Sequence, residues 1–181
     1  MLLAKFSQAP LDMLTTLGKR SNEQPTMRDM LVDCHARIRK FCALAKRLGQ
    51  GGPTQQIADA AAQLRRYFGI ALPLHIRDED ESLRPRLERL GDGLLSDALD
   101  AMTHEHVAAD IALADLLEQW DAIAREPSEA RCLATHEPAV WLTRHLLAHL
   151  HDEETRVFPA LDRLPPAQWS AVVAEMKARR R

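Results

Sequence analysis

Residues that favour β-strands are scarce in this chain of 181 residues. Aromatic residues make up only 4%, and valine, isoleucine and threonine together number 20, against 54 alanines and leucines. Strands are enriched in β-branched and aromatic residues, whereas alanine and leucine favour helices. The composition therefore predicts an all-α protein, and a hydrophobic fraction of 46% is enough for a sizeable core in one domain.

The sequence also lacks an excess of charge of one sign. Its 24 lysines and arginines stand against 26 aspartates and glutamates, which gives a net charge of −2. This balance argues against a surface built mainly to bind nucleic acid or an acidic membrane. No apolar run approaches the ~20 residues of a membrane-spanning helix, and the first residues do not form a signal peptide. We therefore expect a cytoplasmic protein with neither a nucleic-acid nor a membrane partner.

Cysteine is scarce as well. The chain has only Cys34, Cys42 and Cys132, and no two of them form a CxxC pair. An odd number of cysteines without such spacing is typical of thiols in a reducing compartment. We expect a packing role for Cys34 and the other two.

Glycines and prolines are concentrated at four breaks, which separate long segments of helical character. We expect helices over residues 27–48, 55–90, 97–125, about 136–163 and 166–178. The side chains that could cap the first four of these helices are those of Thr26, Thr54, Ser96 and Thr135.

These breaks suggest a division of the chain into three parts. Residues 1–25 are expected to form an arm that packs on the main domain, which comprises residues 26–164. Residues 165–181 are expected to form a short helix with a basic tail. The arginines at 179–181 are typical of a frayed, solvated helix end.

Apolar residues recur at helical spacing, as in the series Leu95, Leu99 and Met102. Such a stripe buries one face of each helix against its neighbours. Four long helices joined by short loops favour an up-down-up-down four-helix bundle. Pro73 and Pro85 fall inside the second predicted helix, where each removes a backbone donor and is expected to bend the helix without ending it.

Histidine is the residue type in excess, with 8 in the chain. His75 and Glu79 are four residues apart on the second predicted helix, and His149 and Glu153 are four apart on the fourth. Residues at this spacing share one helix face, so each pair directs an imidazole and a carboxylate toward the bundle interior. The first and third helices offer one further histidine each, His35 and His106 respectively.

Four imidazoles and two carboxylates from four helices fit two metal ions about 3.5–4 Å apart, with both glutamates able to bridge them. Mixed nitrogen and oxygen ligands suit iron, manganese or zinc. Each histidine alone has a more ordinary interpretation as a satisfied core residue, and the acidic run from Asp78 to Glu81 could be a solvated face. Burying all six residues without a metal would be costly, so joint ligation is the better hypothesis.

The remaining polar residues carry weaker expectations. His145 and Asp110 could form a pair beside the ligands, although an unrelated histidine at the core edge is an equal alternative. His104, His136 and His151 are expected to be exposed, and Glu153 is favoured over Glu154 as the ligand by its spacing from His149. Trp120, Trp141 and Trp169 are expected to pack in the core or between helices.

Four segments resemble the hemerythrin-like (HHE) domains, a family of non-haem di-iron four-helix bundles. They are CHARI from Cys34, RRYFGIALPLHIRDEDESLRPRLERL from Arg65, MTHEH from Met102 and HLLAHLHDEETRVFPAL from His145. Two His-x-x-x-Glu pairs, each preceded by a histidine-bearing helix, with Phe-Pro after the second, are together a specific pattern. The resemblance covers about residues 27–164.

The resemblance implies that the iron ligands are His35, His75, Glu79, His106, His149 and Glu153. The oxygen carriers of the family place two histidines four apart on the third helix, but here Met102 and Asp110 flank His106 at that spacing. The chain therefore looks like the bacterial members with four histidines and two glutamates. Some of these bacterial members are iron–sulfur cluster repair proteins, which carry a Cys-bearing N-terminal module. The present sequence does not show this module.

The function that the resemblance implies is the binding or sensing of oxygen, nitric oxide or peroxide at two iron ions, with other divalent metals as alternatives. A di-iron redox enzyme (an oxidase, a peroxidase or a nitric oxide reductase) is a further interpretation, and an iron- or stress-response module is another. A purely structural bundle without metal is a third alternative. The sequence leaves the oligomeric state open, and a homodimer is compatible with it.

Overall fold

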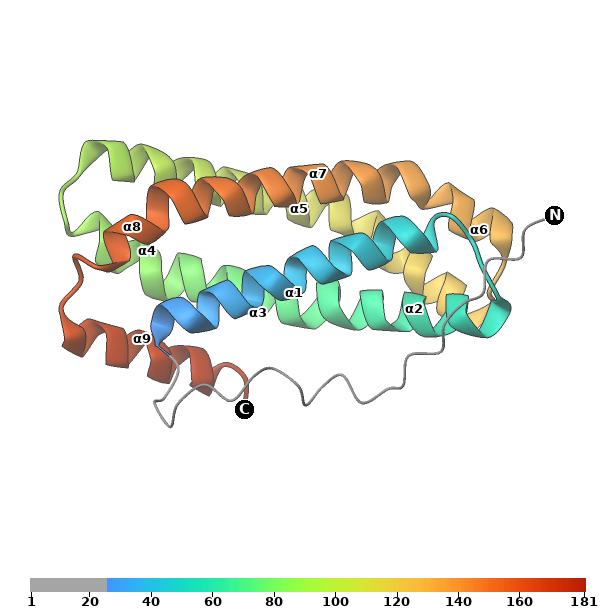
Figure 1. The fold of residues 1–181 in the computed structure, drawn as a ribbon, viewed down its shortest axis with the longest axis horizontal. Helices are drawn as coiled ribbons and strands as arrows, with labels where there is room; N and C mark the ends of the chain where they lie inside the picture. The colour runs from blue at the N-terminus through green and yellow to red at the C-terminus, as the bar shows by residue number, and fades with distance from the viewer. Residues whose placement is uncertain (1–25) are drawn as a thin grey trace, which may run out of the picture.

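A computed structural model of the protein describes residues 26–181, which form helices and the turns between them without a β-strand (Figure 1). The predicted arm of residues 1–25 lies outside the described residues. The first segment of the bundle is α1 (Met27–Leu48) and the third is α5 (Gly93–Arg125). The second and fourth contain π-helical turns, named η1 to η3. Their parts are, in order, α2 (Thr54–Arg66), η1 (Tyr67–Ala71), α3 (Leu72–Arg77), η2 (Asp78–Leu83) and α4 (Arg84–Glu88), then α7 (His136–Asp152), η3 (Glu153–Val157) and α8 (Phe158–Leu161).

The four segments run alternately in opposite directions (Figure 1). Each packs on its neighbours in sequence: α1 on α2, α2 on α5 and α5 on α7, while α7 closes the ring against α1. Two shorter helices, α6 (Glu129–Ala134) and α9 (Pro166–Ala178), precede and follow the fourth segment. The predicted up-down-up-down four-helix bundle is confirmed.

The starts of the helices agree only in part with the predicted caps. Thr26 caps α1 in a capping box, in which its hydroxyl accepts from the Asp29 backbone and the Asp29 carboxylate returns the bond. The predictions for Ser96 and Thr54 were wrong. The carboxylate of Asp92 accepts from the backbone of Leu95, so that α5 begins at Gly93, and Thr54 is itself the first residue of α2.

The prediction that the side chain of Thr135 caps the fourth segment was also wrong. Its hydroxyl donates to the carbonyl oxygen of Cys132 at 2.8 Å, within the extra helix α6, and no side chain caps α7. The short helix α6 occupies part of the predicted break and delivers the chain directly into α7, so Thr135 is already in helical conformation when α7 begins.

Three prolines within the helical segments, Pro73, Pro85 and Pro159, each follow a π-helical turn. Pro73 lies in the first turn of α3 after η1, Pro85 follows η2, and Pro159 follows η3. Proline cannot donate the i→i−4 hydrogen bond, and its ring clashes with the carbonyl of that residue. A π turn widens the helix locally and lets it continue past the proline. As expected, the prolines do not end the second segment. Glu79 and Glu153 lie in the widened turns η2 and η3.

The buried apolar residues form two clusters, one toward each end of the bundle. One includes Ile38, Leu72 and Leu146, and the other includes Leu31, Leu83 and Val157. On each of the four segments, the predicted metal ligands lie in sequence between residues of the two clusters. A buried polar layer therefore crosses the bundle between two apolar cores.

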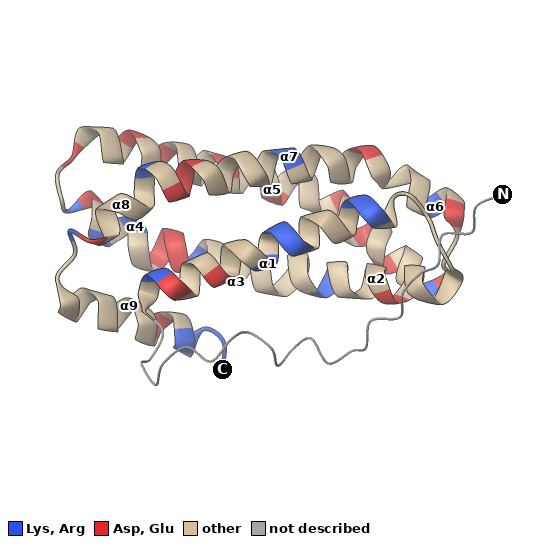
Figure 2. Cartoon of the chain, viewed as in Figure 1, with Lys and Arg blue, Asp and Glu red and all other residues tan. Residues whose placement is uncertain are grey.

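The basic end of the chain is not the frayed, solvated terminus that the sequence predicted. Arg179 and Arg180 bind the carboxylate of Asp78, which is fully buried at the start of η2. They reach it because α9 packs along η2 and α1. Figure 2 shows blue and red segments interspersed over the rest of the bundle. In the described part of the chain, no helix has an apolar stretch long enough to cross a membrane.

Candidate metal centre

All six residues that the sequence singled out as ligands meet in the polar layer, and each is at least 96% buried. Every segment of the bundle contributes one histidine, and the second and fourth also contribute a glutamate. They are His35 from α1, His75 from α3, Glu79 from η2, His106 from α5, His149 from α7 and Glu153 from η3.

Glu79 is at the centre of this cluster. Its Oε1 lies 3.3 Å from His75 Nε2 and 3.8 Å from His35 Nε2, while its Oε2 lies 3.4 Å from His106 Nε2. The carboxylate thus faces histidines of three different helices with its two oxygens.

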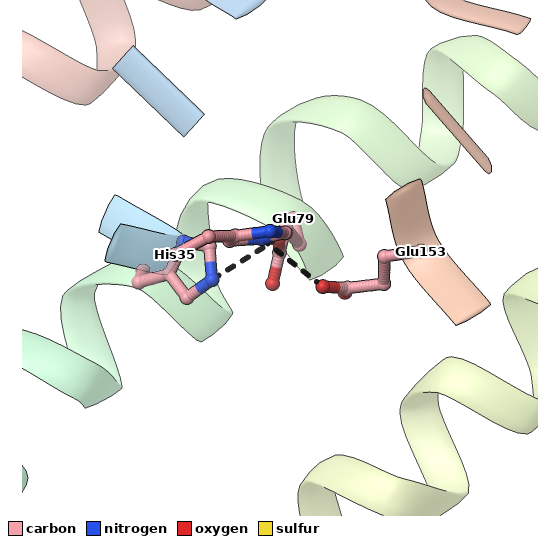
Figure 3. Close-up of side chains that lie close together, drawn as sticks. His35, Glu79 and Glu153 are labelled. Carbon is pink, nitrogen blue, oxygen red and sulfur yellow. Dashed lines mark ion pairs between the residues drawn. The ribbon is translucent and has the colours of Figure 1, made fainter. Parts of the chain in front are cut away.

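Glu153 occupies the corresponding place on the fourth segment. Its Oε2 lies 3.2 Å from His35 Nε2, and its Oε1 lies 3.2 Å from His149 Nε2 and 3.9 Å from His106 Nε2. Figure 3 shows His35 paired with both glutamates. The side chains separate into two donor sets that share Glu79 and Glu153, one with His35 and His75 and the other with His106 and His149.

The atoms that face the centre lack hydrogen bonds. The four carboxylate oxygens of Glu79 and Glu153, and Nε2 of His35, His75 and His106, are buried without a hydrogen-bond partner among the described residues. Leaving so many buried polar atoms unpaired is costly. Two atoms that bind one ion at ~2.1 Å, at right angles to each other, lie about 3 Å apart. The observed separations, from 3.2 Å upward, suit ligands directed at shared cations.

Carboxylates also contact the outer nitrogens of three histidines. His35 Nδ1 lies 2.8 Å from Glu154 Oε1, His149 Nδ1 lies 2.8 Å from Glu105 Oε2, and His106 Nδ1 lies 3.2 Å from Asp80 Oδ1. A carboxylate at Nδ1 holds the proton there and leaves the Nε2 lone pair directed inward. His75 Nδ1 has no such partner among the described residues.

The sequence interpretation missed the role of these three carboxylates. The sequence suggested a solvated face for the acidic run that contains Asp80, it disfavoured Glu154 as a ligand by spacing, and Glu105 appeared only within the segment MTHEH. A signal was present, because Asp80 and Glu154 each directly follow the glutamate of a His-x-x-x-Glu pair. A step of one residue turns about 100° around a helix, which brings the second carboxylate toward a neighbouring helix.

The charges of the cluster shift the pKa of its histidines. Burial acts to lower the pKa of His35, but the carboxylates of Glu153 and Glu79 outweigh it and raise this pKa to about 10. Burial opposes the carboxylates of Asp80 and Glu79 in the same way at His106, whose pKa rises to about 10. Burial dominates at His75 and lowers its pKa. Protons on His35 and His106 thus neutralise the glutamates, and metal ions that replaced them would release these protons.

The structure places His145 differently from the predicted pair with Asp110. His145 does not pair with Asp110: its Nε2 lies 3.0 Å from the Glu105 carbonyl oxygen, its ring stacks on Trp141, and Asp110 is exposed. His145 therefore supports the backbone of a residue that contacts a ligand.

The expectations for exposed and packed residues hold in part. His104 and His151 are exposed as predicted, whereas His136 is half-buried because it lies against Gly49. Trp120 is buried and Trp169 packs against the second apolar cluster, but Trp141 is 48% exposed, because it lies on the outer side of α7 over His145.

Comparison with known proteins adds two findings. The family model described as the hemerythrin HHE cation binding domain matches residues 26–161, which include the whole cluster. An uncharacterized protein of Haemophilus influenzae is 28% identical over 105 residues, 56% of this chain. The match spans 56% of that protein as well, so the similarity covers little more than half of either chain.

Proposed function

The chain belongs to the family of hemerythrin HHE cation-binding domains, and on this premise we propose that it is a non-haem di-iron protein that binds or senses oxygen, nitric oxide or peroxide. The observation that carries the proposal is the pair of donor sets that share two buried glutamates. His35 and His75 would hold one ion and His106 and His149 the other, with Glu79 and Glu153 belonging to both donor sets.

The chemistry of the donors supports this assignment. Two imidazoles and two shared carboxylates at each position suit iron, and also manganese or zinc. Iron bound there supplies a change of oxidation state and a coordination position for a small ligand. The protein's own contribution is to orient the imidazoles through Glu154, Asp80 and Glu105, and to exclude water with the apolar clusters at either end.

The surroundings favour a ligand of few atoms. Two surface pockets of about 410 and 360 Å³ are lined by residues such as Arg163 and Arg84, and none of the six ligands lines either of them. A buried centre of this kind admits a diatomic molecule or peroxide more readily than an organic substrate. We therefore propose binding or sensing as the activity, with redox turnover as the alternative.

The first experiment measures metal content. The full chain is purified without oxygen, loaded with Fe(II) and analysed by mass spectrometry, and about two irons per chain are expected for a two-metal site. His75→Ala and His149→Ala should each lose at least one iron. His104→Ala is the matched control, because His104 is exposed and its hydrogen bond among the described residues goes to the Asp100 carbonyl oxygen in its own helix. Absence of iron uptake by the wild type, or full uptake by both ligand variants, would rule out the assignment.

A second experiment tests the ligand. Nitric oxide, oxygen and hydrogen peroxide are added separately to the loaded protein, and the visible absorption spectrum is recorded. Binding predicts a saturable change that His149→Ala abolishes. Continuous consumption of peroxide or nitric oxide with a reductant would support the enzymatic alternative, and an unchanged spectrum with all three would contradict both.

A further inference from the structure

A fully buried carboxylate outside the metal cluster lies at the start of η2. Asp78 is 0% exposed and directly precedes Glu79 in the chain. Its Oδ1 accepts from Arg179 Nη1 at 2.9 Å, and its Oδ2 accepts from Arg180 Nη2 at 2.5 Å. Each oxygen of the carboxylate is thus held by one arginine from the end of α9.

Arg179 and a further arginine, Arg86, also contact other residues of this turn. Arg179 also donates to Ser82 Oγ at 2.8 Å and to Glu81 Oε2 at 3.2 Å. Arg86, in α4 directly after η2, donates to the Ser82 carbonyl oxygen at 2.6 Å and binds Glu175 of α9. The π turn is therefore bonded to α9 through several of its residues.

The same turn carries two groups of the metal centre. Glu79 faces three histidines, and Asp80 holds the outer nitrogen of His106. A π turn departs from the regular helical hydrogen-bond pattern, so its geometry depends on tertiary contacts. Without the arginines, Asp78 would be a buried carboxylate with no cation, and relieving that cost by bringing it to water would rotate the turn. Such a rotation would move Glu79 away from the histidines.

We infer that Arg179, Arg180 and Asp78 form a clasp that positions Glu79 for metal binding. The clasp, defined by these three residues, acts through the turn and touches no metal. This inference deepens the proposed function and rests on it for the metal-binding readout alone. Because α9 packs on α1 as well as on η2, the effect should be greatest at the position formed by His35 and His75.

The test compares Arg179→Ala/Arg180→Ala with Lys177→Ala/Arg181→Ala in the full chain. The control pair removes the same charge from exposed positions of the same segment. Anaerobic titration with Fe(II) should show at least tenfold weaker binding of one ion to the clasp variant, and a change of less than twofold in the control. If the clasp variant bound each ion as tightly as the control variant does, the inference would be overturned.

A second readout does not depend on metal. Amide hydrogen exchange in the metal-free protein should be at least tenfold faster for residues 78–83 in the clasp variant, and unchanged in the control. Should the wild type bind no iron, the proposed function fails, but the exchange rates still decide whether the arginines hold the turn. Equal exchange in the clasp variant and the control would show that they do not.

A third variant separates positioning from folding. Asp78→Asn/Arg179→Gln/Arg180→Gln removes the buried charge together with its partners, so its metal-free melting temperature should be close to that of the wild type. Its Fe(II) affinity should still be reduced, because neutral amides hold the turn less firmly than ion pairs do. Wild-type affinity in this triple variant would contradict a positioning role.

Discussion

Single side chains orient three of the four histidines in the centre. Glu154, Glu105 and Asp80 contact the Nδ1 atoms of three histidines, and each of these carboxylates comes from a helical segment other than the one that carries its histidine. Glu154 is itself held by two bonds from Arg39, at 3.0 and 2.9 Å. A partner of this kind fixes the tautomer and raises the basicity of the inner nitrogen.

We expect Glu105→Gln to weaken Fe(II) binding by about 10- to 100-fold, the usual cost of losing such a partner. Glutamine keeps the size of the side chain but no longer holds the Nδ1 proton of His149 by charge. Fe(II) titration provides the measurement. Glu118→Gln is the control, since Glu118 is exposed on the same helix. Equal affinities in the two variants would show that Glu105 has no influence on the ligand.

The spacing of four residues indicated four of the six candidate ligands but not the partners of their outer nitrogens. His75 and Glu79 lie on one helix face whatever surrounds the helix, so the sequence alone indicated them. Glu154 reaches His35 only because η3 and α1 lie side by side at a particular rotation. For the same reason the sequence suggested Asp110 for His145, and the folded bundle presents a backbone carbonyl instead.

Two junctions between helices show how the elements are joined. At the end of α1, a Cβ added to Gly49 would lie 2.7 Å from the Cα of His136 at the start of α7. At the start of α5, Asp92 both caps the helix and binds Arg163, just beyond α8, at 2.7 Å. Both junctions depend on contacts between residues far apart in the chain.

Gly49→Ala is expected to lower the free energy of unfolding by roughly 1–3 kcal/mol, because the backbone of one helix must move to accept the methyl group. Urea denaturation measures the change. Gly93→Ala is the matched control: the position is helical, no atom of residues 26–181 lies within 4 Å of its added Cβ, and its φ is not positive. The control should be stabilised by up to ~1 kcal/mol through reduced freedom of the unfolded chain. A Gly49 variant as stable as this control would refute the close approach.

Asp92→Ala should lower the melting temperature at pH 7, and the difference from the wild type should shrink as the pH falls below 4. The bond from Arg163 and the backbone bond from Leu95 lower the pKa of Asp92 below its usual 3.8. A carboxyl with a lowered pKa contributes stability above its unfolded-state pKa, and this is lost as the pH falls through the folded-state value. Calorimetry from pH 7 to pH 3 measures it, with exposed Asp97→Ala as control. A difference that is independent of pH would contradict the ionic contribution.

The elements themselves were largely predictable. Helical periodicity and the cap at Thr26 are local properties, and they gave the four segments. The π turns were not predicted, because Pro73 and Pro85 can bend, kink or widen a helix, and packing decides among these. The sequence also did not favour Asp92 over Ser96 as the cap of α5. Both residue types cap helices well, and only the geometry of the loop decides between them.

At the scale of the molecule, a polar layer separates two apolar clusters. Buried carboxylates without hydrogen bonds destabilise this layer, and cations that bind only the folded state stabilise it. The metal centre is therefore also a structural joint between the two halves of the bundle.

Removal of metal is expected to lower the melting temperature markedly. Iron at a free concentration 100 times its Kd stabilises a folded protein by ~2.7 kcal/mol. For a chain of this size, each kcal/mol corresponds to roughly 2–4 °C. Calorimetry of the loaded protein and of chelator-treated protein measures the shift. The melting temperature of His149→Ala should respond less to the chelator than that of the wild type does. An equal response in both would show that the stabilisation does not come from metal at this site.

The sequence by itself determined the four helical segments, their order and the two His-x-x-x-Glu pairs, and it offered His35 and His106 as one further histidine on each of the other two segments. The segments and the pairs follow from spacing along the chain, which is a local property. Only the tertiary structure decided that Glu154, Glu105 and Asp80 orient the histidines, and that Arg179 and Arg180 hold Asp78 beside Glu79. Those contacts join residues distant in the chain, and they form only when packing fixes the rotation of each helix against its neighbours.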